Sequence, residues 1–96
     1  MKRTDPKTIK EIIDRVLDDE SIRDEARAQR ICYLWPEIVG PGINRHTIRR
    51  YVADHILHVH IDSAPLKNEL QFHRSRLVEQ LNSAAGADVI TDITFH

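Results

Sequence analysis

Apolar residues recur every three or four positions in three stretches of the chain, a spacing that places them on one side of a helix. We expect helices over residues 6–18, 24–39 and 64–84. Pro36 should kink or end the second helix, because proline lacks the backbone N–H and crowds the preceding turn. The third helix carries His73 in its apolar stripe, and a histidine at such a position is expected to be buried and hydrogen-bonded.

Three other stretches alternate apolar and polar residues, which predicts strands over residues 47–53, 56–62 and 89–95. Asp54-His55 between the first two should form a tight hairpin turn, slightly strained because position 55 is not glycine. Five apolar residues of the last two strands should face the helices: Leu57, Val59, Ile61, Ile93 and Phe95.

The first strand has a mixed pattern. Ile48, Arg50 and Val52 should share one of its faces, whereas Arg49 and Tyr51 should share the other. The whole order is helix, helix, strand, strand, helix, strand. Helices packed on one face of a three-stranded sheet would bury all of these apolar stripes, so the expected fold class is α+β.

Composition sets the size and class of the protein. The chain has 96 residues, 41% apolar and 30% charged, with a net charge of -1, which is typical of one globular domain over residues 1–96. The apolar runs are far shorter than the roughly twenty residues that span a bilayer. The first residues lack the apolar core of a signal peptide, so we expect a cytoplasmic protein without membrane contact.

The residues that could carry chemistry do not form a catalytic motif, so we expect no enzyme and no cofactor. Cys32 is interpreted as a small core residue. His58 and His60 should point to the same outer face, and a zinc site built on them ranks last among the alternatives, since no further ligand is evident. Trp35 lies on the apolar side of its helix and is expected to be a core anchor rather than a base-stacking residue.

Basic residues are the strongest functional signal. Between Arg27 and Arg50 the chain has one acidic residue, Glu37. The guanidinium group suits phosphate contact, because it offers a planar fork of donors. The candidate nucleic-acid-binding residues are Arg45, His46, Arg49, Arg50, Lys67 and Arg74.

Three segments in register resemble the DciA-like family of bacterial proteins, long described as a domain of unknown function. They are Trp35-Pro36-Glu37-Ile38-Val39-Gly40 with the hairpin that follows, Ser63-Ala64-Pro65-Leu66-Lys67-Asn68-Glu69-Leu70, and Leu81-Asn82 with Val89-Ile90-Thr91-Asp92-Ile93-Thr94-Phe95. The resemblance implies a KH-like fold in a short, single-domain member of the family. KH domains hold nucleic acid through a GxxG loop, and this chain has Gly40-Pro41-Gly42 instead.

The resemblance also implies a role in DNA replication, with a DnaB-type helicase and single-stranded nucleic acid as partners, DNA ranked ahead of RNA. Two alternatives stay open at this point. The domain could dock on a helicase or another protein without touching nucleic acid, or it could bind RNA. The sequence does not indicate an oligomeric state.

Overall fold

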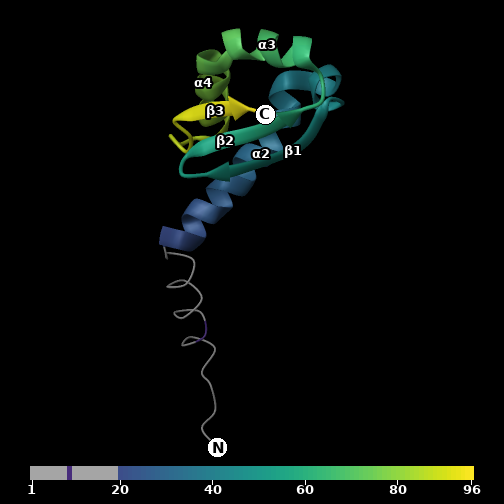
Figure 1. Cartoon of the computed structure of the whole chain (residues 1–96). Helices are drawn as coiled ribbons and strands as arrows, with labels where there is room; N and C mark the ends of the chain where they lie inside the picture. The colour runs from purple at the N-terminus through teal and green to yellow at the C-terminus, as the bar shows by residue number, and fades with distance from the viewer. Residues whose placement is uncertain (1–8, 10–19) are drawn as a thin grey trace, which may run out of the picture.

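The computed structural model describes residue 9 and residues 20–96, and Figure 1 shows the arrangement of its elements. They are α2 (Glu20–Asn44), β1 (Thr47–Ala53), β2 (Ile56–Ile61), α3 (Ala64–Phe72), α4 (Arg74–Ala85) and β3 (Asp92–Phe95). This mixture confirms the predicted α+β class. Apart from residue 9, the helix predicted over residues 6–18 lies outside the described residues. Within the described part of the chain, no helix is long and apolar enough to cross a bilayer.

The sheet has the order β1-β2-β3, with β1 antiparallel to β2 and β3 parallel to β2. The hairpin turn is formed by Asp54 and His55, whose φ angles of 52° and 64° are both positive. Two positive φ angles match the right-handed twist of the flanking strands, but they are unfavourable for residues that carry a Cβ. The predicted turn and its slight strain are therefore confirmed.

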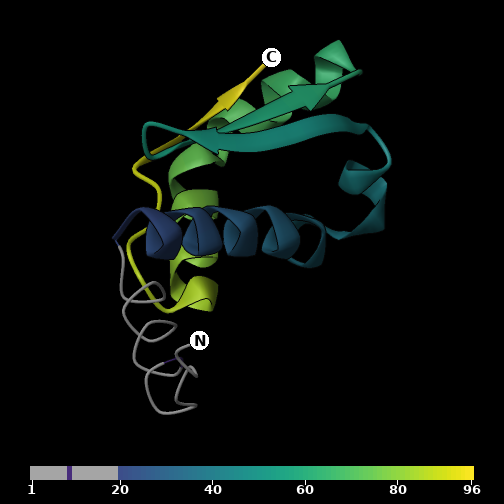
Figure 2. The same ribbon diagram turned by 90° about the horizontal axis from the view of Figure 1, so that it is seen from below.

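The core lies between one face of the sheet and the helices, and Figure 2 shows α2 and α4 together beneath the sheet. Every second residue of β2 and β3 is buried, as predicted, through Leu57, Val59, Ile61, Ile93 and Phe95. Trp35 of α2 is 0% exposed, and its ring centroid lies 6.2 Å from that of Phe95. The indole Nε1–H donates to Oγ1 of Thr47 at 3.1 Å. The prediction of Trp35 as a core anchor is confirmed.

Helix α2 is longer than predicted. It begins at Glu20 rather than near residue 24, so part of the segment between the first two predicted helices is itself helical. The helical backbone continues through Pro36 and first leaves helical angles at Gly40, whose φ is 84°. Glycine adopts that angle without a steric penalty, so the break falls at Gly40, directly after the predicted helix end at residue 39 and not at Pro36.

The long helix predicted over residues 64–84 is wrong in one respect, because His73 divides it into α3 and α4. The His73 N–H donates to the Leu70 carbonyl three residues back, and the His73 carbonyl accepts from Leu77 N–H as the first bond of α4. The side chain is 50% exposed and lies 3.5 Å from Glu69, so the expectation of a buried His73 is also wrong. With this break, α3 contacts β2 and β3, while α4 packs on α2 and also contacts β3.

Two strand predictions need correction. The pairing of β1 with β2 shifts between Thr47 and Arg49, and this bulge turns Ile48 out of the apolar face, where its residue is 70% exposed. The third strand begins at Asp92 and not at residue 89. Val89 and Ile90 are buried in a loop that Asn82 holds, because its Oδ1 accepts from both backbone N–H groups and its Nδ2 donates to the Ile90 carbonyl.

Candidate nucleic-acid interface

The sheet face opposite the core carries the polar residues of the alternating pattern. Arg49 pairs with His60 and Tyr51 with His58 across the hairpin. In the parallel pair, Val59 is the partner of Phe95, so the next residues along, His60 and His96, are also neighbours. The residues on this surface are Arg49, Tyr51, His58, His60 and His96, and we call it the outer face.

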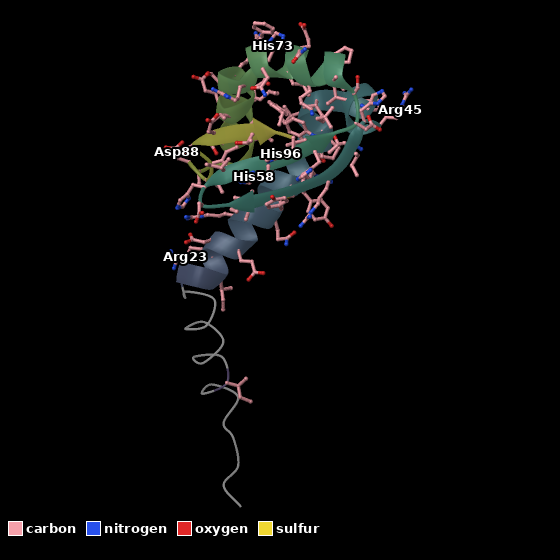
Figure 3. The ribbon with its side chains drawn as sticks, in the orientation of Figure 1. Arg23, Arg45, His58, His73, Asp88 and His96 are labelled. Atoms are coloured by element: carbon pink, nitrogen blue, oxygen red, sulfur yellow. The ribbon has the colours of Figure 1, made fainter. Side chains whose placement is uncertain are left out.

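The side chains of the outer face stack on one another. The guanidinium carbon of Arg49 lies 4.7 Å from the centroid of the Tyr51 ring. Tyr51 stacks on His58 with centroids 4.9 Å apart, and His60 stacks on His96 at 4.6 Å. Figure 3 shows His58 and His96 close together on the sheet, away from His73 at the α3–α4 corner. An arginine over an aromatic ring can contact phosphate while the neighbouring rings stack on bases.

His60 carries a buried ring nitrogen on this face. Its Nε2 atom is buried and has no hydrogen-bond partner in the described structure. Burial lowers the pKa of His60, and the positive charges of His96, Arg49, His58 and Lys67 lower it further. His60 is therefore neutral at physiological pH, and its environment opposes protonation.

Arg50 points the opposite way from Arg49, as the alternation predicted. Its Nε donates to the backbone carbonyl of Cys32 on α2 at 2.7 Å. In an uninterrupted helix that carbonyl would accept from the N–H of residue 36, but Pro36 has no N–H. Arg50 thus supplies the hydrogen bond that the proline removes. Burial raises the pKa of the Cys32 thiol, an effect that Arg50 partly offsets, so the thiol stays protonated at neutral pH.

The other predicted site residues are spread over the molecule. Arg45 is exposed in the turn between α2 and β1, and His46 beside it contacts Asp62 through Nδ1 at 2.7 Å. Lys67, on α3, is close enough to the outer face to lower the pKa of His60 through its positive charge. Arg74 at the start of α4 forms an ion pair with Asp92, with Nε and Oδ1 3.0 Å apart. Arg49 and Lys67 are thus the predicted cations whose charges act on His60 at the outer face.

Sequence reasoning did not find His96. The alternation of residues 93–95 predicted that it would follow a strand, but the parallel pairing of β3 beside β2 has no signal in the local sequence. His58 and His60 were placed correctly on one outer face. Among the described residues, no group of three or more histidine, cysteine or acidic side chains is arranged to hold a metal ion.

Comparison with known proteins agrees with the resemblance seen in the sequence. No curated protein matches the chain. The family model described as "Dna[CI] antecedent, DciA" matches residues 8–95, which is nearly the whole of the 96-residue chain, and the protein therefore belongs to the DciA family.

Proposed function

We propose that the protein is a DciA-type replication factor that binds single-stranded nucleic acid, DNA in preference to RNA, through its outer face. In this proposal it acts in the cytoplasm as a binding domain and not as an enzyme, and its protein partner is a DnaB-type replicative helicase. Membership of the DciA family supports the helicase partner. The described order of elements, α2-β1-β2-α3-α4-β3, is compatible with the KH-like fold that the family resemblance implies.

The observation that carries the nucleic-acid part is the position of Arg49 over Tyr51, next to a stack of imidazole rings. Two features of single strands match this surface. Their phosphates bind guanidinium groups, and their bases are free to stack on flat rings. Arg45, exposed at the start of the hairpin, offers a second phosphate contact. Arg50 points to the opposite face of the sheet, where it donates to the Cys32 carbonyl, so it does not belong to this surface.

The test is binding of an oligothymidylate to the double variant Arg45→Ala/Arg49→Ala, measured by fluorescence anisotropy at low ionic strength. Binding to the unmodified protein should weaken steeply with salt, because phosphate contacts release counterions. Loss of two such contacts should reduce the slope of log K against log salt by about 1.4. Stability should change by no more than about 0.5 kcal/mol.

The matched control is Arg27→Ala/Arg76→Ala, which removes the same charge from exposed positions on α2 and α4. It should leave the salt slope nearly unchanged. If the unmodified domain binds neither DNA nor RNA at low ionic strength, the nucleic-acid role is wrong. Docking on a helicase without nucleic-acid contact then becomes the better description of the domain.

A further inference from the structure

Three of the six histidines of the chain meet on the outer face. His58 and His96 are hydrogen-bonded, with Nδ1 and Nε2 3.0 Å apart, and their ring centroids are separated by 5.2 Å. His60 completes the group through its 4.6 Å stack on His96. Tyr51 flanks two of the rings, at 4.9 Å from His58 and 6.0 Å from His60. We call His58, His60 and His96 the histidine cluster.

The hydrogen bond within the cluster depends on its protonation. A bond between two imidazole nitrogens needs one N–H donor and one unprotonated acceptor, so at least one of His58 and His96 is neutral while the bond exists. Protonating both rings would replace this bond by repulsion between two positive charges.

The side-chain charges that act on the pKa of His60 have one sign. Those that act on His60 come from Arg49 on β1, His58 on β2, His96 after β3 and Lys67 on α3, and all four groups are basic. The ring of Tyr51 flanks these groups. No carboxylate is among the groups that act on His60 in the described structure. An anion brought to this face would therefore relieve repulsion between these side chains.

We propose that the histidine cluster is a proton-linked binding site for single-stranded nucleic acid, so that the protein takes up protons as it binds the strand. This inference rests on the proposed function and adds its regulation by pH. The phosphate charge stabilises imidazolium, and a charged imidazole ring stacks more strongly on a base. Because the bound state holds more protons than the free state, affinity rises as pH falls through the range in which histidine titrates.

The experiment measures the affinity of a twelve-residue oligothymidylate between pH 8.0 and 5.5 at constant ionic strength. A rhodamine label is used because its emission does not change over this range. One linked proton can change affinity by up to tenfold per pH unit, so we expect an increase of about tenfold or more over the whole range. Two double variants are compared with the unmodified protein, and circular dichroism confirms that each is folded.

His58→Gln/His96→Gln removes the hydrogen-bonded pair of the cluster and should reduce the pH effect to about threefold or less. His55→Gln/His73→Gln removes two histidines that lie in the hairpin turn and at the α3–α4 corner, and it should keep the full effect. The inference is overturned if the unmodified protein binds the strand with the same affinity at both ends of the range, or if the cluster variant keeps the full effect. In both cases the proposed function stands. Absence of binding at every pH overturns the proposed function and this inference together.

Discussion

Replacing Arg50 by methionine tests whether this residue completes the hydrogen bonding of α2. The variant Arg50→Met keeps most of the aliphatic length but removes the donor to the Cys32 carbonyl, which Pro36 cannot replace. A hydrogen bond from a charged donor contributes about 1.5–3 kcal/mol, and a half-buried carbonyl without a partner is unfavourable. For a domain of this size, such a loss corresponds to a melting temperature lower by about 6–24 °C.

A double-mutant cycle with Pro36→Ala separates this bond from the other effects of losing arginine. Alanine at position 36 has an N–H that can donate to the Cys32 carbonyl along the helix, so Arg50 is no longer needed there. The cost of Arg50→Met, measured by urea denaturation, should therefore fall by at least about 1 kcal/mol in the Pro36→Ala background. Equal costs in the two backgrounds, to within about 0.3 kcal/mol, would refute the proposed link between proline and arginine.

Three further outcomes are expected. Trp35→Ala should cost about 3–5 kcal/mol in a urea titration, because it empties a fully buried site; an unchanged melting temperature would contradict its role in the core. Asn82→Ala should cost about 2–3 kcal/mol by the same assay, since three hydrogen bonds to Val89 and Ile90 are lost, and a cost below about 0.5 kcal/mol would show that the loop holds itself. The pKa of His60 is lower in the folded protein than its ordinary value, so the fold is most stable above the pH range in which histidine ordinarily titrates. This stability is lost as the pH falls toward the lowered pKa. The melting temperature should therefore drop on acidification, and less so in His60→Gln; an equal drop in both proteins would exclude His60 as a cause.

The strands were predictable because each of their faces has a different environment. Leu57, Val59 and Ile61 are buried while His58 and His60 between them are partly exposed, and this contrast is visible in the sequence as alternation. A bulge has no such signature. Ile48 fits the alternation of its strand equally well, and its displacement depends on how β1 pairs with β2.

The division at His73 could not be predicted for a related reason. Leu66, Leu70, Leu77 and Leu81 would form one continuous stripe on an uninterrupted helix, and neither glycine nor proline lies between them. Both halves contact β3, but only α3 contacts β2 closely and only α4 packs on α2, so the division accompanies a difference in tertiary packing. The candidate site shows the same limit. The arginines and two histidines could be assigned to faces, whereas the place of His96 beside them follows from a pairing between distant segments.

The parallel pairing of β3 with β2 also bears on the order in which the protein folds. The hairpin closes through two residues, but β3 reaches β2 only after the connection over residues 62–91 has closed. Closing a long connection costs more conformational entropy than closing a short one, so we expect the hairpin to form early and β3 to dock late. Until β3 docks, one edge of β2 has unpaired backbone groups beside the exposed Leu57 and Val59 side chains. Two chains that fold at the same time could pair with each other at this transient edge. A high local concentration of newly made chains would favour such association.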